Sequence, residues 1–366
     1  MKRDIVLFMP SIDKGGVEKN FFLISNYLAN YNSKIKVITI SKKFKNRFNR
    51  KIEFISLKWN FWDKLTRRIK FSLALILLII EILRNKNLLV ISFQANMYCA
   101  YLSKLFGFKL IIRSNSSPYG WSQNFFKKKL YKLGFTFAEG IIVNSIAFKR
   151  QIENLFKVKA KHIYNPLNTS EIIKLSKKRI KFKFFRKGYL NIISVGRLVD
   201  QKDHLTLLKS LNSIKYKINF KLLIIGDGYN KLNILNYIKN NKLNSNVKLL
   251  TDISNPFPYI LKADILVLSS VFEGLPNVLL EALTLKKFII STNCPTGPSE
   301  ILNNGKGGIL VPVKDHVKLS KKIIFYKENS KILKNKVHYA RKNLKRFDKD
   351  NVLKEYKKFI DLYLHK

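Results

Sequence analysis

One stretch of the sequence constrains the fold of this chain most. An apolar run at residues 263–268 leads into a polar loop that contains Gly274 and Pro276, and residues 277–285 follow with the apolar stripe of a helix. The run is typical of a short buried strand, and the glycine and proline end it before the helix begins. Open α/β sheets bind their ligands where a strand ends in a polar loop that opens a helix. The stretch therefore predicts an α/β fold with a ligand site at this loop.

Two glutamates mark the same loop and helix. Glu273 precedes the predicted helix and Glu281 lies within it, so we expect the two carboxylates to lie at opposite ends of one small ligand. Either residue alone could be an ordinary loop acid or a solvated helix glutamate. Their spacing around the Gly-x-Pro break favours a shared ligand.

The length and composition indicate two ordinary globular domains. The chain has 366 residues, of which 46% are hydrophobic, enough for two cores, and 13% are aromatic, which argues against disorder. Its two cysteines, Cys99 and Cys294, fall one in each predicted domain and show neither a disulfide framework nor zinc-site spacing. This usage predicts a reducing, cytoplasmic environment.

The charge of the chain is strongly positive. Seventy Lys and Arg residues stand against 23 Asp and Glu, which gives a formal net charge of +47. A nucleic-acid partner, an anionic membrane with anionic substrates, or a Lys-rich compositional bias could each explain it. The lysines are dispersed through every segment, which favours the bias first and a membrane surface second. Because no nucleic-acid recognition motif is present, we expect no nucleic-acid partner.

Two apolar segments share some features with targeting or membrane-spanning sequences. Residues 1–8 have an apolar run too short for a signal peptide and are predicted to form the first strand. Residues 71–80 are wholly apolar, but a bilayer-spanning helix needs about 20 residues. Their pattern favours a core helix, and an interfacial helix over residues 71–83 with basic flanks stays open as the alternative.

Further candidate binding residues occupy predicted strand ends. Gly15 and Gly16 stand just before a predicted helix, where backbone amides can approach a phosphate, although a plain turn is the simpler explanation. Gln94 and Asn115 each follow a predicted strand, and we expect their side chains to face a cleft between the two domains, on the side where a second substrate would enter.

A glycine turn in the second half of the chain carries two basic residues. Arg197 and Lys202 follow the strand predicted at residues 190–195, and both could reach one anionic group, the arginine with two parallel hydrogen bonds. On these residues alone, a surface turn is the simpler explanation.

Taken with its surroundings, the Glu273–Glu281 stretch resembles the Glu-seven residues-Glu signature of the family-4 retaining glycosyltransferases (glycosyl transferases group 1), which have the GT-B fold. The Gly-Gly-x-Glu at residues 15–18, the Gly-Arg and Lys-Asp pairs at 196–203, and the turn at 305–312 match the family in order along the chain. The resemblance implies two doubly wound Rossmann-like α/β domains facing across a cleft. We expect an acceptor-side domain at 1–170, a linker at 171–188, a nucleotide-sugar-binding domain at 189–350, and a helix at 351–366 that returns to the first domain.

The resemblance also implies roles for individual residues. Arg197 and Lys202 would neutralise the charge on the departing diphosphate, Glu273 would contact the donor sugar, and Glu281 would hold the ribose. Arg197, Lys202 and Glu273 are thus the predicted catalytic residues. The other predicted donor contacts are Gly15, Gly16, Leu275, Pro276, Asn277, Val278, Thr296 and Gly297.

The chain departs from the family at the acceptor side, where many relatives carry a histidine and this sequence has Asn115. The single Asp-x-Asp, residues 348–350, is predicted to cap the last helix, so we expect neither a metal nor another cofactor.

These features predict a retaining, metal-independent, hexosyltransferase-type enzyme. The expected donor is a nucleotide-diphosphate sugar, UDP before GDP, and the expected acceptor is a lipid-linked or cell-envelope glycan. We expect a cytoplasmic protein that is peripheral on the inner face of the cell membrane. The alternatives are a nucleotide-sugar 2-epimerase or a sucrose- or glycogen-type synthase of the same fold, and, in a different class, a basic nucleic-acid-binding protein.

Overall fold

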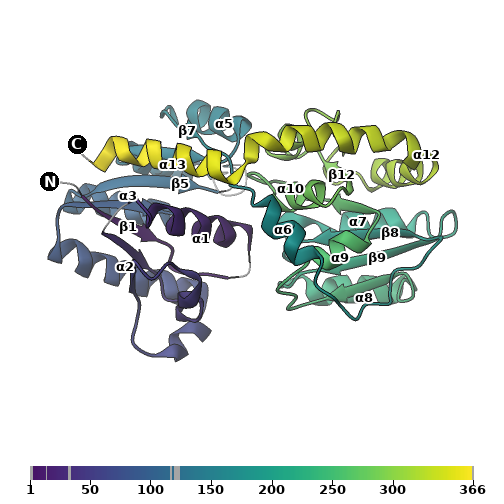
Figure 1. The fold of residues 1–366 in the computed structure, drawn as a ribbon, viewed down its shortest axis with the longest axis horizontal. Coiled ribbons are helices and arrows are strands. Elements are labelled where there is room, and N and C mark those ends of the chain that lie inside the picture. Colours follow the sequence, from purple (N-terminus) through teal and green to yellow (C-terminus); the bar gives the residue numbers. More distant parts are fainter. Residues whose placement is uncertain (1–2, 14, 32–33, 116–117, 119–123, 365–366) are drawn as a thin grey trace. The chain divides into compact units, whose positions relative to one another are not determined.

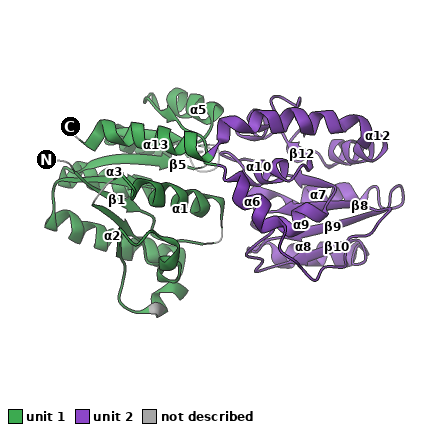
Figure 2. Cartoon of the chain, in the orientation of Figure 1, with its two compact units in different colours: residues 1–166, 349–366 green, residues 167–348 purple. Residues whose placement is uncertain are grey.

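The structure is a computed structural model that describes residues 3–13, 15–31, 34–115, 118 and 124–364. The chain divides into two compact units, shown in different colours in Figure 2. Unit 1 comprises Met1–Pro166 and Lys349–Lys366, and unit 2 comprises Leu167–Asp348.

Unit 1 is built on a seven-stranded sheet with the order β3-β2-β1-β4-β5-β6-β7, in which every pairing is parallel (Figure 1). Its strands are β1 (Asp4–Phe8), β2 (Ile35–Ile38), β3 (Ile52–Ile55), β4 (Leu88–Ser92), β5 (Lys109–Ser114), β6 (Gly140–Val143) and β7 (Lys161–His162). Its helices are α1 (Gly16–Leu28), α2 (Arg67–Arg84), α3 (Asn96–Phe106), α4 (Phe125–Thr136), α5 (Ile146–Phe156) and α13 (Lys349–Leu364), with short 3-10 helices η1 (Lys42–Arg47) and η2 (Asn60–Lys64).

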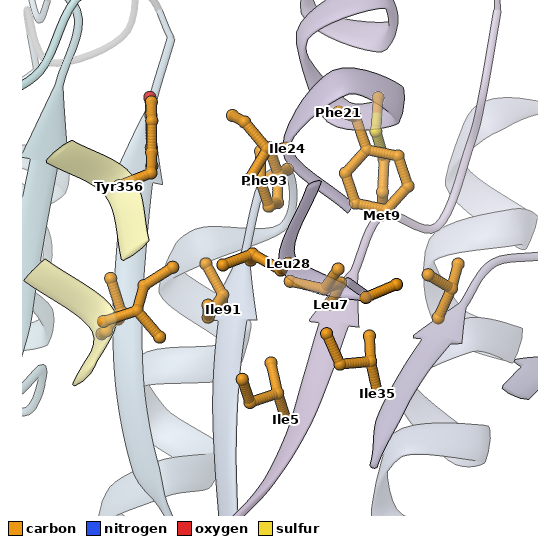
Figure 3. Close-up of a cluster of buried hydrophobic side chains, with 14 of the residues drawn as sticks. Ile5, Leu7, Met9, Phe21, Ile24, Leu28, Ile35, Ile91, Phe93 and Tyr356 are labelled. Carbon is orange, nitrogen blue, oxygen red and sulfur yellow. The ribbon is translucent and has the colours of Figure 1, made fainter. Parts of the chain in front are cut away.

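Alternate strand residues point to opposite faces of this sheet, so each strand supplies two cores. On one face, Ile5, Leu7 and Ile91 pack with residues of α1 and α13, as Figure 3 shows for Phe21 and Tyr356. On the other face, the intervening strand residues pack against α2, α3, α4 and α5. Unit 1 is therefore doubly wound, with the C-terminal helix α13 forming part of its core.

The apolar segment at residues 71–80 lies within α2. Ala74, Leu78 and Ile82 are buried against the sheet, whereas Ile76 and Leu83 are exposed on the opposite side of the helix. The segment thus forms a core helix along one side and presents an apolar outer side. In the part of the chain that the structure describes, no helix is long and apolar enough to cross a membrane.

A buried arginine ties α13 to the sheet. Arg113, at the end of β5, is 1% exposed and donates hydrogen bonds to the Tyr356 hydroxyl and the Asn165 side-chain oxygen, each at 2.8 Å, and to the side-chain oxygen of Asn115. Its guanidinium group also lies 5.3 Å from the centre of the Phe93 ring. Hydrogen bonds are the main compensation for a buried cation, so each acceptor matters to the stability of unit 1.

We expect Tyr356→Phe to lower the free energy of unfolding by about 1.5–3 kcal/mol, because it removes one acceptor from a buried charge while keeping the ring. Urea unfolding followed by circular dichroism measures the effect. Tyr98→Phe, which removes an exposed hydroxyl in the same unit, is the control. Equal stabilities for the two variants would contradict a stabilising role for the Arg113–Tyr356 bond.

Unit 2 contains a six-stranded parallel sheet with the order β10-β9-β8-β11-β12-β13. The strands are β8 (Leu190–Val195), β9 (Phe220–Ile225), β10 (Val247–Leu250), β11 (Ile265–Leu268), β12 (Phe288–Thr292) and β13 (Ile309–Val311). Helices α7 (His204–Asn212), α8 (Lys231–Asn240) and α12 (His316–Lys342) pack on one face. Helices α6 (Thr169–Ser176), α9 (Phe257–Lys262) and α10 (Asn277–Thr284) pack together, with α9 against β8 and α10 against β11 and β12. The remaining elements are α11 (Pro298–Ile301), η4 (Asp200–Lys202) and η5 (Asn343–Phe347).

The stretch predicted as a linker, residues 171–188, differs in the structure, where it belongs to unit 2. Its first part lies in α6, which Asn168 caps by accepting a hydrogen bond from the Glu171 amide. Ile172 is buried, because α6 packs against α9 and α10. The basic composition of this stretch concealed a short helix with one apolar side. The prediction of two doubly wound α/β domains is confirmed.

Candidate functional site

The site in unit 2 begins at the point where the strand order of its sheet reverses. From β8 the chain continues to β9 on one side, while β11 pairs with β8 on the other side, with Ile192 opposite Ile265. The loops that follow β8 and β11 therefore leave the same edge of the sheet next to each other. Ligands of open α/β sheets bind at such a switch point.

The loop after β8 brings Arg197 and Lys202 to this edge. It passes so close to the end of β9 that a Cβ atom on Gly226 would lie 1.9 Å from the Gly196 oxygen. Glycine is therefore required at 226 for the loop to take this path. The loop ends at Asp203, which has a φ of 44° and caps α7 by accepting from the Thr206 amide at 3.2 Å.

Lys202 and Glu273 are in direct contact. The Lys202 ammonium donates to Glu273 Oε1, and the Ser270 hydroxyl donates to the same oxygen at 2.6 Å. Glu273 is only 6% exposed and the Lys202 side chain is 15% exposed, so this is a largely buried ion pair with an additional hydrogen bond. The structure thus joins two residues that were predicted from separate stretches of the sequence.

Besides the Lys202–Glu273 contact, three hydrogen bonds join the two loops. The side-chain amide of Gln201 donates to the Phe272 carbonyl at 2.8 Å. The backbone carbonyl of Gln201 accepts from the Val271 amide, also at 2.8 Å. The Ser269 hydroxyl donates to the Lys202 carbonyl at 3.0 Å. Gln201, Ser269 and Ser270 were not among the predicted site residues, and their only signal in the sequence is their position beside Lys202 and Glu273.

Arg197 differs from Lys202 in its exposure. Its side chain is exposed, and one guanidinium nitrogen lies 3.3 Å from the Gln201 side-chain oxygen. A guanidinium group in this position can turn toward an anion with two parallel donors.

The loop after β12 completes this edge of the sheet. The Thr296 hydroxyl donates to the Glu273 carbonyl, and Gly297 has a φ of 89°. A Cβ atom on Gly297 would lie 2.6 Å from Pro276 Cδ and 2.7 Å from the Gly274 oxygen, so only glycine fits. The structure therefore gathers the predicted donor contacts Leu275, Pro276, Asn277, Val278, Thr296 and Gly297 at the start of α10.

Glu281 lies within α10 and is 6% exposed, like Glu273. A glutamate is seldom this buried unless it makes polar contacts, which agrees with a specific role and excludes the alternative of a solvated helix glutamate.

The predicted residues of unit 1 lie around the switch point of its own sheet, between β1 and β4. Gly15 and Gly16 begin α1, and the Glu18 carboxylate lies close against Gly15. Gln94 follows β4 and accepts from the Ser11 amide at 3.2 Å, so it anchors the loop after β1.

Asn115 makes contacts within unit 1. Its side-chain amide donates to the Phe93 carbonyl at 2.9 Å, and its oxygen accepts from Arg113. These contacts give Asn115 a structural role, because its side-chain oxygen is one of the hydrogen-bond acceptors of the buried Arg113. A role for Gln94 or Asn115 toward an acceptor stays a prediction.

A cavity of about 340 Å³ opens beside the loop after β8. Its lining includes Asp200, His204, Val271 and His316. None of the residues that line this cavity is a predicted donor contact.

His204 is a buried histidine at the start of α7. Its Nδ1 lies 3.5 Å from the Ser194 hydroxyl. Burial, with a smaller contribution from the nearby Lys202 charge, lowers the pKa of His204 to about 4 from the ordinary value of 6.5. The imidazole is therefore neutral near pH 7, and His204 serves as a packed interior residue beside the loop after β8.

This pKa predicts a pH dependence of stability. Between pH 6.5 and about 4 the unfolded chain binds a proton at His204 that the folded chain excludes, so stability is complete above pH 6.5 and falls as the pH decreases. The loss should reach about 3 kcal/mol near pH 4. Urea unfolding between pH 7.5 and 4 should show a shallower decrease for His204→Asn than for the native chain. The exposed His338→Gln should keep the native slope, and identical slopes in all three proteins would refute the assignment.

Comparison with known proteins agrees with this architecture. Residues 176–343 match the model of the family described as Glycosyl transferases group 1. An uncharacterized glycosyltransferase of Methanocaldococcus jannaschii is 36% identical over 179 residues, which cover 47% of this chain and 44% of that protein. An N-acetylgalactosaminyltransferase of Campylobacter jejuni, named for a diphospho-undecaprenol-linked acceptor, is 27% identical over 72% of this chain and 73% of that protein.

Among solved structures, Anabaena HepE in complex with UDP matches 98% of this chain and 99% of its own, with a TM-score of 0.77 and 17% identity. That likeness concerns the fold. Together with the family match in unit 2, it confirms the predicted GT-B architecture and enzyme class. The chain is a glycosyltransferase with the GT-B fold, and its residues 176–343 are similar to the family described as Glycosyl transferases group 1.

Proposed function

We propose that this enzyme transfers a sugar, with retention and without a metal, from a nucleotide-diphosphate donor to a lipid-linked or cell-envelope glycan. A UDP-sugar is the favoured donor. The observation that carries the proposal is the meeting of Arg197, Lys202 and Glu273 on two hydrogen-bonded loops at the switch point of unit 2.

The departing nucleotide diphosphate gains negative charge as the glycosidic bond breaks. Lys202 and the exposed Arg197 would stabilise that charge, and backbone amides at the start of α10 would add to it. Two protein cations supply the electrostatic stabilisation that a divalent metal gives in other transferases. We therefore expect the reaction to proceed in the presence of a chelator.

The two glutamates would orient the donor. Glu273 Oε1 accepts from Lys202 and Ser270, while Oε2 has no hydrogen bond within the described part of the chain and can accept from a sugar hydroxyl. Glu281 would hold the ribose, as the family resemblance implies. Among the described residues at this edge, no side chain stands out as a nucleophile, so the acceptor would attack from the face that the diphosphate leaves.

The donor and acceptor classes rest on the relatives and on charge. HepE was solved with UDP, and the Campylobacter relative is named for a lipid-diphosphate acceptor. A net charge of +47 suits a protein that works on the anionic inner face of the cytoplasmic membrane. Gly15 and Gly16 would approach the donor phosphates through their amides.

A thermal-shift screen over UDP-, GDP- and ADP-sugars in EDTA tests the donor. We expect a UDP-sugar to raise the melting temperature by several degrees, because a ligand stabilises the state that binds it. A shift for none of the nucleotide sugars, or a shift only after a divalent metal is added, would contradict the proposal. Product analysis with the donor alone separates transfer from 2-epimerisation.

Substitutions at the two cations test the mechanism. We expect Arg197→Ala and Lys202→Ala each to lower kcat at least tenfold, since each removes a charge that stabilises the leaving diphosphate. Lys239→Ala, at an exposed lysine of α8, is the matched control and should keep native turnover. Near-native kcat in either cation variant would count against the diphosphate clamp.

A further inference from the structure

Three helices of unit 1 lie next to each other on one face of its sheet. Contacts join α2 to α3 and α3 to α4, and the Tyr101 hydroxyl donates to the Leu130 carbonyl at 2.9 Å. The inner sides of these helices are buried in a common core, through residues that include Ala74, Ala100 and Phe135. Their outer sides therefore belong to one layer.

These outer sides carry large apolar residues that are open to solvent. On α4, Phe125 and Phe126 are each 75% exposed, and on α3, Leu105 is 74% exposed. We define the α3–α4 surface as the exposed residues Tyr98, Leu105, Phe125, Phe126, Leu130 and Leu133. Single exposed apolar residues are ordinary, but a group of six on adjoining helices marks an interaction surface.

The charged residues of the same helices are all of one sign on the outer side. Neither α3 nor α4 contains Asp or Glu, and their lysines are Lys104, Lys127, Lys128, Lys129 and Lys132, all exposed. The neighbouring α2 adds exposed arginines at 67, 68 and 84, and its one acid, Glu81, is buried against Lys36 at 2.5 Å. A partner that fits must be both anionic and apolar.

We propose that the α3–α4 surface is where the enzyme docks on an anionic lipid bilayer, with α4 lying in the plane of the interface. Apolar side chains such as Leu130 would enter the acyl boundary, and the lysines would reach lipid phosphates with their flexible stems. This inference deepens the membrane part of the proposed function and names the surface responsible. The acceptor would then be met at the bilayer on which the enzyme rests.

Binding to vesicles of stated composition tests the proposal with the full chain. Equal parts of phosphatidylglycerol and phosphatidylcholine provide the anionic bilayer, and phosphatidylcholine alone provides the neutral one. One variant removes the apolar contacts by Phe126→Gln, Leu130→Gln and Leu133→Gln. Another removes charge by Lys127→Gln, Lys128→Gln and Lys129→Gln. All six positions are exposed, and glutamine keeps good helix propensity.

Each variant has a matched control in unit 2. Leu232→Gln, Leu235→Gln and Ile332→Gln remove three exposed apolar residues. Lys321→Gln, Lys322→Gln and Lys331→Gln remove three exposed lysines of α12, so they lower the net charge by the same amount. We expect the α4 variants to lose at least tenfold in affinity for anionic vesicles and the controls to stay within twofold. Equal losses in the α12 variant would show that total charge alone drives binding, and would overturn the proposal.

A site-specific probe gives a second readout. Leu130→Cys labelled with an environment-sensitive fluorophore should shift its emission to the blue on anionic vesicles, whereas labelled Leu232→Cys on α8 should not. The two native thiols are buried, and burial raises the pKa of Cys294 to about 12 and that of Cys99 further, so neither competes for the label. Unchanged emission at position 130 on bound vesicles would overturn the proposal.

The same variants separate this inference from its rivals. If the α4 lysine variant loses affinity for RNA but keeps its affinity for vesicles, the surface binds nucleic acid and the membrane assignment is wrong. The thermal shift with UDP-sugar should survive in every α4 variant. Vesicle binding without any donor shift would refute the proposed sugar transfer while leaving the docking surface intact.

Discussion

The buried ion pair between Lys202 and Glu273 is the interaction on which the rest of the site depends. Removing both charges from water is costly, and the pair is tolerated only because Ser270 adds a hydrogen bond and Gln201 fixes the two loops to each other. The pair fixes the positions of the Lys202 ammonium group and the Glu273 carboxylate before a donor binds. Preorganised charges of this kind stabilise a transition state without reorganising during the reaction.

Two glycines allow the backbone to bring these loops into contact. Gly226 lets the loop after β8 cross the end of β9, and Gly297 lets the loop after β12 lie against Gly274 and Pro276. A side chain at either position would separate loops that must touch. The chemistry of the site is thus set by strand order and close backbone packing as much as by its charged residues.

Much of the fold followed from the sequence, because buried parallel strands give continuous apolar runs and their loops carry the polar residues. The Glu273–Glu281 stretch and the Arg197–Lys202 turn were each recognisable. The structure shows why they belong together, because β8 and β11 are neighbours although 69 residues, 196–264, lie between the end of β8 at Val195 and the start of β11 at Ile265. Gln201 could not be found in this way, since a glutamine in a turn has no pattern of its own. The helix α6 was hidden within a basic stretch, and the exposed side of α4 has the same periodicity as a core helix.

The most direct test of the account is a crystal structure of the enzyme with an intact UDP-sugar. We expect diphosphate oxygens within about 3 Å of both Arg197 and Lys202, and a sugar hydroxyl hydrogen-bonded to Glu273 Oε2. A nucleotide bound away from the loops after β8 and β11, with the Lys202–Glu273 pair untouched, would contradict it.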